Sequence, residues 1–241
     1  MINLTDDAAH LQLQILEDVF DTESVRVGTR NLTEGQRNLI CLIEDGEVVA
    51  TSPWGELTEA FLQVNSDRYK TGTKSIKRET FPDVLTGLDE IEFTVRGYPA
   101  SNNEKLLLIL ISRFIEFQAL SHGSGEFDVS FQYLSRLDDE FGTQQIYKWL
   151  GESEIETHVY GIRDDPSVVN ELDAQIHADH APELSNLWFV VFQPPASPQS
   201  TASVDPVALV AEETGSNVWR GLWTYDPDRV QQIKSYVRQT F

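Results

Sequence analysis

Strand-like and helix-like segments alternate along the chain from Asn102 onward, and this alternation predicts an α/β fold. We expect a layered structure with a mixed, mostly parallel sheet flanked by helices. The predicted helix at residues 104–120 supports this view, because its first half is apolar on every side and belongs deep in a core. The length of 241 residues is enough to bury such a core within a single domain.

The amino-terminal part of the sequence predicts short elements joined by recognisable turns. Asp45 and Gly46 separate two strand-like runs and are typical of a tight hairpin, because both residues adopt positive φ at low cost. We expect Ser52 to cap a helix with Pro53 in its first turn. The other predicted elements here are a helix at residues 10–21 and strands at residues 26–30, 38–43 and 90–95.

The second part of the sequence predicts most of the sheet. Asp226 and Pro227 are expected to cap the last helix, at residues 228–240. Another helix should begin at Asp138 or Asp139 and end near Leu150, and a short one should begin at Asp165. The predicted strands are residues 128–134, 156–162, 187–193, 207–212 and 218–225, with a loop at 194–206.

Charge is the unusual feature of the composition. The chain has 39 acidic and 18 basic residues, a net charge of −21, and the acids are dispersed along it. Such a surface repels itself unless salt screens it, so we expect a halophilic protein. The alternative is an acidic protein that binds cationic partners. Direct nucleic-acid binding is not expected, because clustered basic residues are absent from the sequence.

The sequence has no recognisable export signal and no apolar run of membrane-spanning length, so a cytoplasmic location without a membrane span is expected. It contains a single cysteine, Cys41, which we expect to be an inert core thiol. It also lacks a phosphate-binding loop and a Gly-x-Ser-x-Gly nucleophile elbow. These absences from the sequence favour a protein that is not an enzyme.

Several motifs of the second part occur in a recognisable order. They are Ser-Arg-Phe-Ile-Glu at 112–116, Phe-Gln-Tyr-Leu-Ser-Arg at 131–136, and Arg-Gly-Leu-Trp-Thr-Tyr-Asp-Pro at 220–227, the last being the most specific. Together they resemble the DICT domain, a sensory family associated with diguanylate cyclases and two-component systems. Residues 1–100 resemble the amino-terminal portion of stand-alone DICT proteins of halophilic archaea. The whole chain, 1–241, would then be one DICT-like domain with its core portion at 101–241.

The resemblance implies a non-catalytic sensory or regulatory module for signal transduction. No output segment is attached in this sequence, so the module would act through a separate signalling protein, with a small-molecule ligand and a homodimer as further expectations. The family has no established catalytic residue to transfer, and its ligand is not settled, so the resemblance implies no particular cofactor. Two alternatives stay open: an enzyme acting on a small soluble substrate with Arg113, Glu116 and His158 as polar groups, or a scaffold protein without a ligand.

The first candidate site is polar. Arg113 and Glu116 lie one helical turn apart on the predicted core helix and therefore face one another. They form either a structural ion pair or the polar floor of a ligand pocket shared with Gln132 and Arg136. Desolvating such a pair costs several kcal/mol unless it is well hydrogen-bonded, so a pair of this kind is kept for a reason.

The second candidate site is aromatic. Strand alternation places Trp219, Gly221, Trp223 and Tyr225 on one face. Either this face packs beneath a helix, or Gly221 leaves a gap in which a flat ligand stacks on Trp223 near Tyr225.

One segment of the sequence carries a possible metal-binding pattern. His177 and His180 are three residues apart with Asp179 between them, a spacing with which two histidines can bind a metal on a helix. A further ligand to support the two histidines is not evident, so we expect a polar turn and no metal.

Overall fold

The computed structural model describes residue 28 and residues 38–65, 81–96, 104–137, 141–164, 172–179, 181–195 and 204–241. The predicted helix at 10–21, the strand at 26–30 apart from Gly28, and the short helix expected from Asp165 lie outside the described residues.

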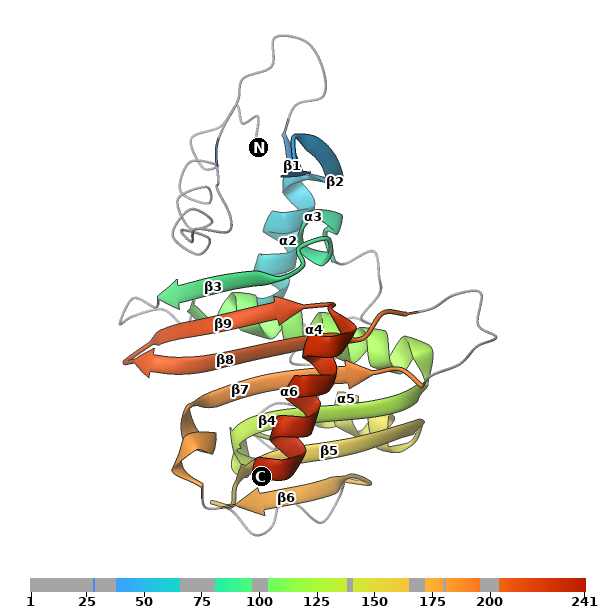
Figure 1. Cartoon of the computed structure of the whole chain (residues 1–241), viewed down its shortest axis with the longest axis vertical. Helices are drawn as coiled ribbons and strands as arrows, with labels where there is room; N and C mark the ends of the chain where they lie inside the picture. Colours follow the sequence, from blue (N-terminus) through green and yellow to red (C-terminus); the bar gives the residue numbers. More distant parts are fainter. Residues whose placement is uncertain are drawn as a thin grey trace.

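A mixed seven-stranded sheet, in the order β3-β9-β8-β7-β4-β5-β6, forms the centre of the described structure (Figure 1). Its strands are β3 (Ile91–Arg96), β4 (Ser124–Tyr133), β5 (Glu154–Ile162), β6 (Gln175–Asp179), β7 (Leu187–Gln193), β8 (Val207–Gly215) and β9 (Val218–Thr224). This confirms an α/β fold and the strands predicted in the second part of the chain.

The expectation of a mostly parallel sheet is wrong. Only the pairs β4–β5 and β5–β6 are parallel, and the other four pairs are antiparallel. The β4–β5 connection contains the helix α5 (Phe141–Gly151), which allows a parallel crossover. The chain from β8 to β9 reverses in a tight turn at Asn217, whose φ is 58°, and such turns join antiparallel neighbours.

The amino-terminal part contributes to the same sheet. Strand β3 pairs with β9 along its whole length, from Ile91 opposite Trp223 to Arg96 opposite Val218. One edge of the sheet is therefore formed by β3, a strand that precedes residue 100, and the other strands follow residue 120.

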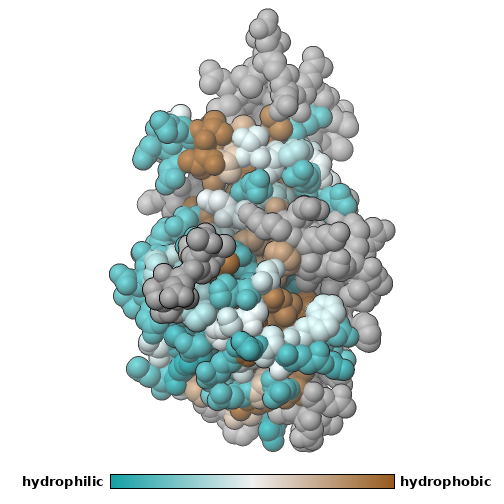
Figure 2. All heavy atoms as spheres, turned by 90° about the vertical axis from the view of Figure 1, so that its right-hand side faces the viewer, coloured by the Kyte–Doolittle hydropathy of each residue, from teal (hydrophilic) through white to brown (hydrophobic). Residues whose placement is uncertain are grey.

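A separate two-stranded hairpin confirms the predicted turn. It joins β1 (Leu39–Glu44) to β2 (Glu47–Pro53), with positive φ at Asp45 (49°) and Gly46 (88°). Its exposed side chains include Ile43, Val48 and Val49. Figure 2 shows apolar side chains reaching the surface toward this end of the molecule.

Two helices follow the hairpin, α2 (Trp54–Asn65) and α3 (Asp83–Thr86). The capping role expected of Ser52 is wrong, because β2 continues through Pro53 and α2 begins only at Trp54. The Ser52 hydroxyl instead accepts a hydrogen bond from the backbone N–H of Val84 in α3, at 3.2 Å. Its partner is a helix more than thirty residues further along the chain.

Helices cover the two faces of the sheet unequally (Figure 1). On one face lie α4 (Glu104–His122) and α5, and across the other runs α6 (Pro227–Thr240). Leu108 and Ile115 of α4 are fully buried, which confirms that the predicted core helix lies deep. A smaller cluster under α6 packs Val230 and Val237 against Phe189.

The last helix begins as the sequence predicted. The Asp226 side chain accepts a hydrogen bond from the backbone N–H of Arg229 at 2.8 Å, and Pro227 occupies the first turn.

In the part of the chain that the structure describes, no helix is long and apolar enough to cross a membrane.

Candidate functional site

The predicted pair Arg113–Glu116 is enclosed between α4 and α5. The Arg113 Nη1 atom lies 2.6 Å from Glu116 Oε2, and Arg113 Nη2 donates to Thr143 Oγ1 at 2.7 Å. The Tyr147 hydroxyl donates to Glu116 Oε1 at 2.9 Å. Burial, together with the Glu116 charge, raises the pKa of Tyr147. All four side chains are buried, so the pair and its partners cross-link two helices.

Gln132 and Arg136 do not join that pair. Phe131 turns toward α5, where its ring packs on Tyr147 with 4.9 Å between centroids. Gln132 has a positive φ of 56° and turns the other way, donating from Nε2 to the Ser185 carbonyl of the 3-10 helix η4 (Pro182–Asn186) at 2.8 Å. Arg136 donates to Gln132 Oε1. The four polar candidates therefore form two separate groups.

The aromatic candidates form a packed face. A Cβ atom added at Gly221 would lie 2.4 Å from Phe93 Cζ, because β3 places the Phe93 ring directly over this glycine. Trp223 is buried, with its ring 6.1 Å from that of Phe114 in α4. The Tyr225 hydroxyl donates to the Thr86 carbonyl at 2.9 Å. The space expected for a flat ligand is filled by Phe93 in this structure.

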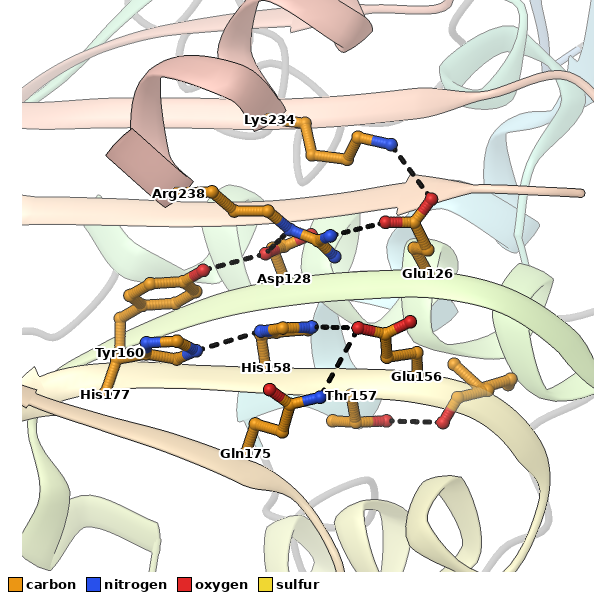
Figure 3. Close-up of polar contacts among 11 residues, drawn as sticks. Glu126, Asp128, Glu156, Thr157, His158, Tyr160, Gln175, His177, Lys234 and Arg238 are labelled. Atoms are coloured by element: carbon orange, nitrogen blue, oxygen red, sulfur yellow. Dashed lines mark hydrogen bonds and ion pairs between the residues drawn. The ribbon is translucent and has the colours of Figure 1, made fainter. Parts of the chain in front are cut away.

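A polar cluster that the sequence interpretation missed lies on the α6 face of the sheet (Figure 3). At its centre is Asp128 of β4, whose side chain is 0% exposed. Arg238 of α6 donates to both carboxylate oxygens of Asp128, from Nε at 2.9 Å and Nη2 at 3.0 Å. The Tyr160 hydroxyl of β5 donates to the same carboxylate at 3.0 Å. A bidentate arginine is among the strongest partners available to a buried carboxylate.

A second carboxylate of β4 extends this attachment. Glu126 Oε2 lies 2.5 Å from Arg238 Nη1, and Glu126 Oε1 lies 3.1 Å from Lys234 Nζ. Partial burial acts to raise the pKa of Glu126, but Lys234 and Arg238 outweigh it and the pKa is lowered. Lys234 and Arg238 are one turn apart, so the same face of α6 presents both cations to β4.

A pair of histidines adjoins the cluster. His158 of β5 and His177 of β6 face one another with 2.9 Å between Nδ1 and Nε2. His158 Nε2 lies 2.8 Å from Glu156 Oε1, which also accepts from Gln175 Nε2 at 3.3 Å. We refer to Glu156, His158, Gln175 and His177 as the histidine group.

Tyr160 connects the histidine group to Asp128. Its ring stacks on that of His177 with centroids 4.3 Å apart and planes inclined by 10°. Burial and the neighbouring Asp128 charge raise the pKa of Tyr160, so its hydroxyl stays a hydrogen-bond donor at neutral pH. A continuous series of contacts thus runs from the β6 edge through Tyr160 and Asp128 to α6 (Figure 3).

The segment considered for metal binding is a strand. His177 lies in β6, so the expectation of a polar turn is wrong, and His180 is outside the described residues. Among the residues that the structure describes, no group of three or more histidine, cysteine or acidic side chains is placed to hold a metal ion.

The sequence contained a signal for the missed cluster. Polar residues occur at every second position of otherwise apolar strands, as Glu126, Asp128 and Ser130 in β4 and Glu156 and His158 in β5. Such a series places polar groups on one face. In α6, Lys234 is buried among apolar residues, which a simple apolar-stripe interpretation overlooks.

The comparisons with known proteins add no relative: no family model matches the chain, and neither a curated protein nor a solved structure was found to match it. The resemblance to the DICT domain therefore stays a prediction.

Proposed function

We propose that this chain is a non-catalytic sensory module of the DICT type, in which the histidine group and Asp128 receive a signal and α6 passes it on. The module would work in the cytoplasm of a halophilic archaeon and act on a separate signalling protein. A small-molecule ligand and a homodimer belong to this proposal as well.

The observation that supports the proposal most directly is the attachment of α6. This helix packs on the sheet through Val230 and Val237, but its last turns are also held through Lys234 and Arg238. Removing one partner from a buried ion pair costs about 3–5 kcal/mol, because the other charge is left uncompensated. A signal that changes the surroundings of Asp128 therefore changes how firmly α6 is held.

The position of the histidine group supports an input at the sheet margin. Glu156 has 52% of its side chain exposed and His177 is half-buried, whereas Asp128 is fully buried. Groups that a ligand or solvent can reach are thus connected through Tyr160 to a group that neither can reach directly. Such an arrangement suits a module in which ligand binding or protonation at Glu156 or His177 alters the buried contact between Asp128 and Arg238.

The geometry weighs against the enzyme alternative. Arg113 and Glu116 face α5, on the α4 face of the sheet. His158 points to the other face, with Tyr160 and His177. Three groups divided between two faces of one sheet cannot converge on one substrate.

Hydrogen exchange of the full chain in molar potassium chloride tests the role of Asp128. The Asp128→Asn variant keeps the side-chain shape but removes the charge that Arg238 neutralises. We expect at least about tenfold faster exchange of α6 amides, with α4 amides unchanged. A matched control is Glu92→Gln, which removes an exposed ion pair with Arg220 and should leave α6 unaffected.

Native mass spectrometry of the protein purified from its host in high salt tests the ligand. A bound small molecule that slows α6 exchange on re-addition would support the sensory proposal. If α6 exchanges equally in wild type and Asp128→Asn, the attachment of α6 does not depend on this charge and the proposal fails.

A further inference from the structure

We infer that His158 and His177 form a proton-responsive pair, so that double protonation of this pair loosens strand β6 and the stacking of His177 on Tyr160. This inference rests on the proposed function and names protonation as the signal.

The hydrogen bond between the two rings requires a defined proton count. At 2.9 Å, one of the two facing nitrogens must carry a proton and the other a lone pair. The Glu156 carboxylate accepts only, so it requires a proton on His158 Nε2. A neutral His158 then has its lone pair on Nδ1, and His177 Nε2 is the donor between the rings.

The pair holds one added proton without losing this bond. A charged His158 donates from Nδ1 to His177, which then carries its own proton on the other ring nitrogen. A second proton leaves N–H groups on both facing nitrogens, so the bond is lost and two positive rings oppose each other. The pair therefore has a discrete structural limit at double protonation.

Charged groups around the pair set the pH at which this limit is reached. Burial lowers the pKa of His177, the neighbouring His158 and Arg238 lower it as well, and Asp128 opposes them. Around the pair, the described charged and titratable side chains are Glu156 and Tyr160 of β5, Glu126 and Asp128 of β4, and Lys234 and Arg238 of α6. Double protonation of the pair requires a charged His177, and the lowered pKa of His177 moves that step to more acidic pH than for an ordinary histidine.

The strand that carries His177 is paired on one side only in the described sheet. Strand β6 lies at the edge of the described sheet, pairs with β5, and has five residues. The His177 ring contacts both His158 and Tyr160. When the bond between the rings breaks, the longer Gln175–Glu156 hydrogen bond at 3.3 Å still links the side chains of β6 and β5, but Tyr160 loses the ring that covers it while it still binds Asp128.

Linkage gives the sign of the pH dependence. The pKa of His177 is lower in the folded protein than in an unfolded chain, so the folded state binds fewer protons. This stabilising contribution is full above the unfolded value of about 6.5 and is lost as the pH falls toward the folded value.

The experiment is hydrogen exchange combined with imidazole NMR titration of the full chain in molar potassium chloride. Corrected for intrinsic rates, β6 amides of the wild type should exchange at least about tenfold faster at about pH 5.5 than at about pH 7.5. His177→Gln keeps an N–H donor near the Nε2 position but cannot titrate, so it should lose this acid response. His158→Asn removes the neighbouring positive charge, so the pKa of His177 should rise.

The control is His122→Gln at the end of α4, where the ring contacts the Ser124 carbonyl, and it should keep the wild-type response. An acid response that persists in His177→Gln, or is absent from the wild type, overturns the inference. If β6 opens in acid only when His177 is present and α6 follows, both proposals are supported. If β6 opens and α6 does not respond, the proton-responsive pair stands and the transmission to α6 in the proposed function is overturned.

Discussion

On the α4 face of the sheet, Arg113 and Glu116 are sealed between two helices and bonded to Thr143 and Tyr147. On the α6 face, Asp128 is buried just as deeply, yet its partners lead outward to the half-buried ring of His177. The two faces therefore contain similar charge chemistry in different surroundings.

Burial of a charge does not by itself indicate a functional site. The described partners of Arg113 and Glu116, Thr143 and Tyr147, are themselves buried, so these bonds cross-link the core. Asp128 instead connects through Tyr160 to His177, which is partly exposed, so solvent or a ligand has a route by which to change its surroundings. This distinction moves the candidate site from the predicted Arg113 and Glu116 to Asp128 and the histidine group.

The largest loss of stability is expected from a charge introduced into the core on the α4 face of the sheet. Leu108 is fully buried in the main core, so Leu108→Asp should cost at least about 5 kcal/mol and abolish cooperative melting. Tyr236→Asp on the outer side of α6 is the control, because Tyr236 is 62% exposed and its variant should melt close to the wild type. Circular dichroism in molar salt measures both, and a cooperatively melting Leu108→Asp protein would mean that α4 has an open side.

A smaller effect distinguishes the buried Arg113–Glu116 pair from the partly exposed carboxylate of Glu126. Glu116→Gln leaves the Arg113 charge buried without its carboxylate and should cost about 3–5 kcal/mol of unfolding free energy. Glu126→Gln removes a carboxylate that is 33% exposed, so solvent compensates Lys234 and Arg238 and about 1 kcal/mol is expected. Denaturant titration at one salt concentration provides the comparison, and equal losses from the two variants would remove the distinction between the faces.

The smallest effect concerns the aromatic candidates. Gly221→Ala places a methyl group against Phe93, so it should destabilise the protein by about 1–3 kcal/mol, and Phe93→Leu in the same chain should recover part of this. Gly215→Ala is the matched control on β8, where the nearest atom to an added Cβ lies at 3.9 Å. A neutral Gly221→Ala would show that room exists beside Trp223 and would restore the ligand-gap interpretation.

Local signals predicted much of the fold. Asp45 and Gly46 specify their turn, Asp226 caps its helix and the apolar run after Lys105 places α4 in the core, because each signal depends on residues that are neighbours in sequence. Ser52 shows the limit of this approach. Its sequence neighbourhood is that of a helix cap, but its hydroxyl bonds to Val84 instead.

Local sequence patterns specify the α/β composition, the buried helix and the alternation of polar and apolar residues along β4 and β5, since these follow from side-chain chemistry and short-range backbone preference. The pairing of the strands depends on the tertiary structure, and with it the position of Phe93 over Gly221 and the contact between His158 and His177. The contact between Asp128 and Arg238 joins residues 110 positions apart. No local pattern encodes such a contact, because it depends on the register and layering of the whole sheet and on which face α6 covers.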